Sequence, residues 1–312
     1  MKKFIYKTSL FGLTVLFFII SVLLIINKIY KFPIDPNYDN IEFEKAFNKA
    51  NFKAVIIGNS KVHHALDKKT FNDYFNYSVA YLGSLGTNIS VSKLTLESYL
   101  NNCKLNPDFV FLEVSWFTFS TNRTNYTNLS AELFLNDLNL FKYFNKYHEI
   151  KLLIFNSILR QLKMTENEII YDKNIDKKKK NSPLTKDYIF DNSKFMRTFP
   201  KRIAGINNLF LDDYYAIIDL CKEKNIKLIL FTAPEDLEYS KYQKDREVIK
   251  KIFKESKEKY NNLIYLDYTY GGDFYNKDYE NWLNDSHHIY HSDLFSKLFI
   301  KDLNLHTNLT KP

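Results

Sequence analysis

Short apolar runs alternate with segments of helical periodicity along most of this chain. Five runs predict buried strands, at residues 53–57, 77–81, 109–114, 226–231 and 263–267. The segments between and after them predict helices, at residues 66–74, 88–100, 209–224, 236–260 and 292–303. Such alternation favours right-handed βαβ units and a parallel sheet covered on both faces. We therefore predict a doubly wound, flavodoxin-like α/β domain over residues 51–306.

One long segment interrupts the alternation. Residues 120–206 are polar and rich in Asn and Lys, with a helical stretch of their own around residues 138–162. We interpret the segment as an insertion near the carboxyl ends of the strands, where sheets of this kind bind ligands. It would serve as a lid or as a surface for a partner.

The N-terminus has the character of a membrane anchor. Residues 9–26 are a stretch of 18 residues without a charge. As a helix this stretch would span roughly 27 Å. Lys2, Lys3 and Lys7 precede them and favour a cytoplasmic N-terminus. A cleaved signal peptide is the alternative, but residues 27–36 lack the small residues of a cleavage site.

We therefore predict three parts of the chain. Residues 1–32 form an uncleaved, single-pass anchor in the cell membrane, residues 33–50 form a linker, and residues 51–306 form an extracytoplasmic domain.

The positive charge of the chain belongs largely to this anchor. The formal net charge is +8, but residues 1–32 hold five lysines and no acid, so 39 basic and 36 acidic residues remain. The main remaining cluster, residues 177–180, lies in a polar stretch and predicts a solvated loop. We expect no nucleic-acid partner. The spacing of Cys103 and Cys221 leaves open whether they pair.

Candidate catalytic residues follow the first strand and precede the last helix. Ser60 comes just after the first strand, and Asp285 and His288 lie just before the last helix. The carboxyl ends of parallel strands meet at one edge of a sheet, so these segments can converge although 225 residues separate Ser60 from Asp285.

These residue types suit nucleophilic catalysis. A serine hydroxyl needs a base to remove its proton, and the usual base is a histidine oriented by a carboxylate. We predict Ser60 as the nucleophile, His288 as the general base and Asp285 as the group that orients His288. In the alternative, Ser60 only caps a helix and His288 is a surface histidine.

The two motifs resemble blocks of the SGNH (GDSL-like) hydrolase superfamily. Residues 58–60 (Gly-Asn-Ser) and 285–288 (Asp-Ser-His-His) are similar to its first and last blocks, and residues 78–83 are similar to its second. The resemblance implies an oxyanion hole formed by the N–H groups of Ser60 and Gly83, with Gly86 as the competitor of Gly83.

The third block of the family departs from its pattern here. It is normally Gly-x-Asn, whereas residues 112–116 are Leu-Glu-Val-Ser-Trp. One oxyanion donor is therefore unassigned, with Ser115 or a backbone N–H as the candidates. Such a third block behind a membrane anchor resembles the D-alanyl-lipoteichoic-acid transfer proteins and the alginate acetylation proteins.

This resemblance implies a function and its partners. The expected activity is that of a serine esterase or O-acyltransferase, without a cofactor, on acyl esters of a cell-surface polysaccharide or teichoic-acid-like polymer. A membrane-bound O-acyltransferase is the expected protein partner.

Several neighbouring residues receive lesser assignments. We expect His63 and His64 to lie near the mouth of the cleft and to contact substrate, and Glu113 either to be structural or to line the site. Three aromatic side chains are expected to pack in the core or a lid: Trp116, Phe117 and Phe119.

Two other functions remain as alternatives. A metal-dependent hydrolase would use Asp285 with histidines drawn from His63, His64, His287, His288 and His291, although their spacing matches no specific zinc pattern and we predict no metal. A non-catalytic accessory protein of a membrane O-acyltransferase would act through residues 120–206.

Overall fold

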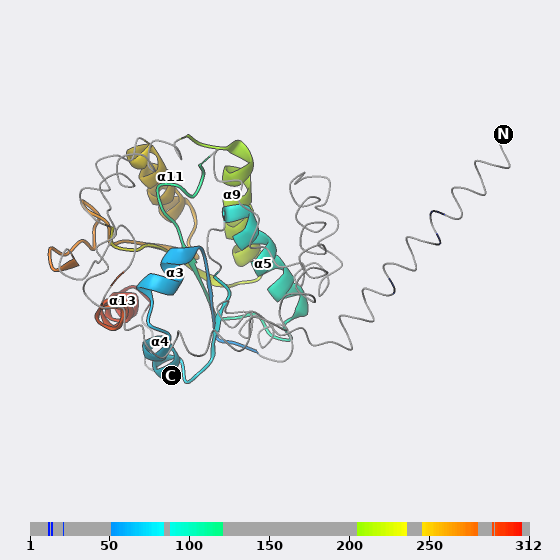
Figure 1. Ribbon diagram of the computed structural model, residues 1–312, viewed down its shortest axis with the longest axis horizontal. Coiled ribbons are helices and arrows are strands. Elements are labelled where there is room, and N and C mark those ends of the chain that lie inside the picture. The colour runs from blue at the N-terminus through cyan, green and yellow to red at the C-terminus, as the bar shows by residue number, and fades with distance from the viewer. Residues whose placement is uncertain are drawn as a thin grey trace, which may run out of the picture. The chain divides into compact units, whose positions relative to one another are not determined.

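The computed structural model describes residues 51–83, 88–120, 205–235, 245–279, 289 and 291–307, together with Gly12, Thr14 and Ser21, which are helical (Figure 1). The chain divides into two compact units, Met1–Ile41 and Glu42–Pro312, and the description below concerns the second. Within the described ranges no helix is long and apolar enough to cross a membrane. The predicted span falls outside them, apart from the three residues named, and so does nearly all of the predicted insertion.

Five parallel strands form the sheet, in the order β2-β1-β3-β4-β5. This is the flavodoxin-like order of a doubly wound sheet, so the doubly wound α/β class that the sequence predicts is confirmed. The strands are β1 (Ala54–Ile57), β2 (Val79–Tyr81), β3 (Phe109–Glu113), β4 (Lys227–Thr232) and β5 (Leu263–Asp267).

Most helices lie where the sequence predicts them, but residues 236–244 of the predicted helix 236–260 lie outside the described residues, so its start is not tested. The helices are α3 (Ser60–Ala65), α4 (Lys68–Tyr74), α5 (Ile89–Asn102), α9 (Asn208–Glu223), α11 (Arg246–Lys259) and α13 (Ser292–Thr307). The helix predicted at residues 66–74 corresponds to α4, which begins two residues later, and the separate short helix α3 ends just before this stretch. Asn59 caps α3 and Asp67 caps α4, each through its side-chain oxygen, so the chain begins a new helix just after α3 ends.

Two apolar cores cover the two faces of the sheet. Side chains alternate along each strand, so Val55 and Ile57 belong to one core while Ala54 and Ile56 belong to the other. The first core includes residues of α5, α9 and α11, and the second includes residues of α3, α4 and α13. Figure 1 shows α5 and α9 side by side, away from α4 and α13. The loops that carry the candidate site follow the carboxyl ends of the strands.

The cysteines do not pair. Cys221 is fully buried and Cys103 is half-buried, and both are free thiols. Burial raises the pKa of Cys221 to about 12 and also raises the pKa of Cys103. Neither thiol is therefore activated.

Candidate active site

Ser60 lies at the junction of β1 and α3, where the sequence predicts it. β1 ends at Ile57, two residues follow, and α3 begins at Ser60. The side chain of Asn59 caps the helix by accepting a hydrogen bond from the Lys61 N–H at 2.9 Å. Because Asn59 performs the capping, Ser60 is not needed for it, and the Ser60 side chain remains partly exposed.

Gly58 allows this junction to approach the end of β3. Its φ is +147°, and a Cβ there would lie 2.7 Å from Val62 Cγ2 and 2.8 Å from Glu113 Cβ. Such distances are too short for any side chain, so this position requires glycine. Glu113, only 3% exposed, therefore lies directly against the loop that presents Ser60.

Gly83 makes the corresponding approach from β2. A Cβ at Gly83 would lie 3.1 Å from Val62 Cγ1 and 3.4 Å from the Gly58 carbonyl oxygen. In the described part of the chain, the N–H groups of Ser60 and Gly83 donate to no acceptor. Two free backbone donors thus flank the loop, as an oxyanion hole requires. Gly86 lies outside the described residues.

His63 links α3 to this second loop. Its Nε2 lies 2.9 Å from the carbonyl oxygen of Gly83, and since a carbonyl only accepts, the ring nitrogen donates. This hydrogen bond gives His63 a role in holding Gly83 in place. A direct contact of His63 or His64 with substrate stays a prediction.

Ile289, the residue just after the late motif, contacts the same helix. The Ile289 N–H donates to the His64 carbonyl oxygen at an N···O distance of 3.4 Å, and its side chain packs in one core cluster with Val62 and Ala65. Ser60 lies about one helical turn before His64. Asp285, His287 and His288 themselves lie outside the described residues.

Ile289 directly follows His288 in the sequence, and it is Ile289 that the structure describes in contact with α3. The catalytic roles of Ser60, His288 and Asp285 stay predictions.

The N–H group of Ser115 is not free to act as the missing oxyanion donor. Its side chain is fully buried, and its N–H donates to Thr118 Oγ1 at 2.7 Å. The three aromatic residues that follow are at most 5% exposed, which confirms their role in packing: Trp116, Phe117 and Phe119.

Sequence reasoning missed a buried ion pair beside Ser60. Lys61 Nζ binds Glu235 Oε1, and both residues are at most 5% exposed. The ammonium also lies 5.4 Å from the centre of the Phe117 ring. Adjacent helical residues point in different directions, so Lys61 reaches the end of β4 rather than the Ser60 hydroxyl. The only signal for it was a glutamate just after a predicted strand.

The metal alternative finds no support in the described residues, where no cluster of three or more His, Cys, Asp or Glu side chains could hold an ion. Of the residues considered for such a site, only His63, His64 and His291 belong to that part of the chain.

Fold and site together define an α/β domain with a serine at the carboxyl edge of a parallel sheet. No protein-family model and no curated protein matches the sequence significantly. Among solved structures, the chain resembles a Bacteroides fragilis protein provisionally named an acylhydrolase. The two are 13% identical with a TM-score of 0.43, and the match covers 88% of this chain and 99% of that one. A likeness at this level assigns neither a family nor an activity.

Proposed function

We propose that the protein is a serine esterase or O-acyltransferase with Ser60 as nucleophile, His288 as general base and Asp285 as the residue that orients it. The observation that carries the proposal is the contact of Ile289 with α3, which brings the chain next to His288 to the helix that starts with Ser60. The partly exposed Ser60 and the free N–H groups of Ser60 and Gly83 support the same chemistry.

The reaction would proceed in two steps. The Ser60 Oγ attacks the ester carbonyl carbon while His288 takes the hydroxyl proton, and the N–H groups of Ser60 and Gly83 stabilise the oxyanion. The C–O bond to the alcohol then breaks, and His288 returns the proton to the leaving oxygen. Water or a sugar hydroxyl attacks the acyl-enzyme, and this choice decides between hydrolysis and transfer.

We further propose that the substrate is an O-acylated polymer outside the cytoplasm, a polysaccharide or teichoic-acid-like chain. Two sequence features support this part: the predicted anchor at residues 1–32, and the resemblance of the site motifs to proteins that work with a membrane-bound O-acyltransferase. Such an enzyme would be the partner of this protein in the cell membrane.

Labelling with a fluorophosphonate tests the nucleophile. We expect the wild-type protein to be labelled and Ser60→Ala to lose labelling, with His288→Ala slowed at least about a hundredfold. Ser292→Ala is the matched control, since Ser292 is also the first residue of a helix, α13. Labelling of Ser60→Ala at the wild-type rate would refute the assignment.

Two further results would point to the other functions. A stoichiometric metal that is lost in His288→Ala would replace the triad with a metal site. Polymer acylation in cells that survives Ser60→Ala but not deletion of the protein would indicate an accessory role.

A further inference from the structure

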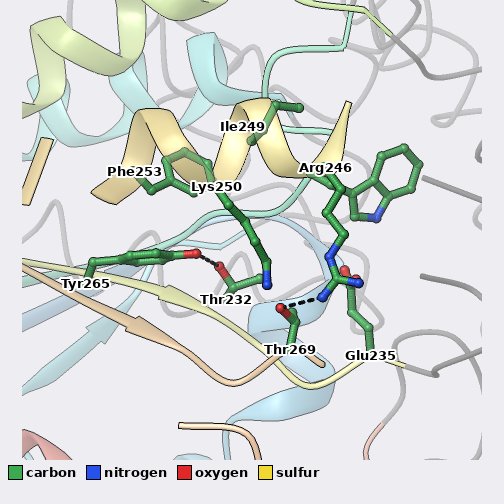
Figure 2. A pocket seen from close by; sticks show the side chains of 9 residues that line it. Thr232, Glu235, Arg246, Ile249, Lys250, Phe253, Tyr265 and Thr269 are labelled. Atoms are coloured by element: carbon green, nitrogen blue, oxygen red, sulfur yellow. Dashed lines mark hydrogen bonds between the residues drawn. The ribbon is translucent and has the colours of Figure 1, made fainter. Parts of the chain in front are cut away.

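A small cavity lies at the carboxyl ends of β4 and β5, against the start of α11 (Figure 2). Its space is sufficient for about one water molecule. The residues that line it include Thr232, Glu235, Arg246, Lys250, Tyr265 and Thr269. Glu235 connects the cavity to the candidate active site, because its ion-pair partner Lys61 directly follows Ser60.

Arg246 presents unused hydrogen-bond donors to this cavity. The residue is 8% exposed, and its Nη2 donates to Thr269 Oγ1 at 2.9 Å and to the Tyr270 carbonyl oxygen at 2.5 Å. A guanidinium carries five N–H donors on three nitrogens. Within the described residues, Nε and Nη1 donate to no acceptor.

Among the described residues, the charges around the cavity do not balance. Lys250 Nζ lies 2.9 Å from Asp267 Oδ2, and Lys61 pairs with Glu235, so each of these two lysines has a carboxylate. Arg246 has no carboxylate oxygen within 4.0 Å in the described part of the chain. A buried cation without a counter-ion is costly, and one negative charge at this place would offset that cost.

We propose that Arg246 binds a carboxylate or phosphate group of the substrate, which places one of its oxygen atoms in this cavity. The planar guanidinium suits such groups because it can donate two parallel hydrogen bonds. The cavity is too small for a sugar ring, so the anion enters while the rest of the polymer stays outside. This inference rests on the proposed function, since it concerns the substrate of the same sheet edge.

Binding of small anions to the full-length protein tests this site without catalysis. Acetate represents a polymer carboxylate and dimethyl phosphate a polymer phosphodiester, and acetamide is the neutral control. By isothermal titration calorimetry we expect one anion to bind, and the tighter one identifies the source of the charge. Arg246→Gln should weaken this binding at least about tenfold. Arg246→Lys keeps the positive charge but cannot donate two parallel hydrogen bonds, so its affinity for the anion should lie between those of the wild-type protein and Arg246→Gln.

Lys257→Gln is the matched control, because it removes one positive charge from an exposed position of the same helix, α11. It should bind the anion like the wild-type protein. The proposal fails if the wild-type protein binds neither anion, or if Lys257→Gln loses as much binding as the two Arg246 variants. If Arg246→Gln does not fold, Arg246→Lys supplies the comparison, because it keeps the positive charge at this buried position.

The same titration with Ser60→Ala separates the two proposals. We expect Ser60→Ala to bind the anion normally while it loses fluorophosphonate labelling. Normal anion binding in a protein that is never labelled would overturn the nucleophile and keep the anion site, and labelling without anion binding would do the reverse.

Discussion

At the scale of single residues, two glycines determine how closely the loops after β1 and β2 approach α3. Gly58 fits between Val62 and Glu113, and Gly83 packs against Val62 and the Gly58 carbonyl oxygen. The geometry of the predicted oxyanion hole therefore depends on the absence of two side chains.

Substitution of Gly58 tests this close packing. In Gly58→Ala, the new residue must adopt a positive φ and its Cβ also overlaps Val62 and Glu113. Gly271→Ala is the control, because its φ is +72° and no atom lies within 4 Å of its Cβ, so that only the backbone is strained. The strain costs about 1–2 kcal/mol, and the overlap should add about 1–3 kcal/mol. Urea unfolding measures both, and equal losses for the two variants would contradict the packing.

The two thiols should differ in reactivity. Only the thiolate reacts with iodoacetamide. Burial raises the pKa of Cys221 to about 12, whereas Cys103 is only half-buried. At pH 8 we expect mass spectrometry of the native protein to show slow modification of Cys103 and none of Cys221. Both should react in urea, and equal native rates would disprove the burial of Cys221.

At the scale of elements, the strands could be predicted from the sequence but α3 could not. The strands are buried on both faces and stand out as apolar runs between polar segments. α3 has only six residues, too few for a helical period to show. Its start depends on the Asn59 cap, and the sequence alone does not show whether the Asn59 side chain caps a helix or faces solvent.

The same limit applies to the buried charges. Lysine and arginine are almost never fully buried unless they are paired. Lys61 is paired with Glu235, 174 residues away in the sequence, and no local sequence pattern indicates such a distant partner. The motifs of the candidate site could be recognised because their residues are adjacent in the sequence. Arg246 and its cavity could not, because they depend on tertiary contacts.

The Lys61–Glu235 pair should fix α3 against the end of β4. Lys61→Met removes the ammonium from a buried carboxylate and should lower the free energy of unfolding by about 3–5 kcal/mol. Lys61→Met/Glu235→Leu should recover part of this loss, because neither charge is then left without the other.

Lys69→Met provides the control for that pair. Lys69 forms an exposed ion pair with Asp73 on α4, and solvent screens such pairs. Its loss should leave the free energy of unfolding nearly unchanged in the same urea experiment. A loss for Lys61→Met no larger than for Lys69→Met would show that the buried pair does not hold the helix.

At the scale of the whole molecule, the fold gathers the loops after β1 and β2 at one edge. Gly58 and Gly83 in these loops both approach Val62 of α3. Ile289, near the end of the chain, contacts the same helix. The sequence predicted this convergence from the alternation of strands and helices, since parallel strands connected through helices must end at the same edge.

The predicted anchor adds a test for the complete chain. The full-length protein should remain in the membrane fraction after alkaline carbonate washing and be released by detergent, because the predicted anchor would place 18 uncharged residues across the bilayer core. A chain without residues 1–32 should be found in the carbonate supernatant. Release of the full-length protein by carbonate alone would exclude an integral anchor.

Trapping of the acyl-enzyme tests the catalytic assignment most directly. After brief mixing with p-nitrophenyl acetate, peptide mass spectrometry should find one acetyl group on the peptide that contains Ser60. His288→Ala should not accumulate it. Release of p-nitrophenol by a protein that never carries acetyl on Ser60, or that carries it on another residue, would contradict the proposed mechanism.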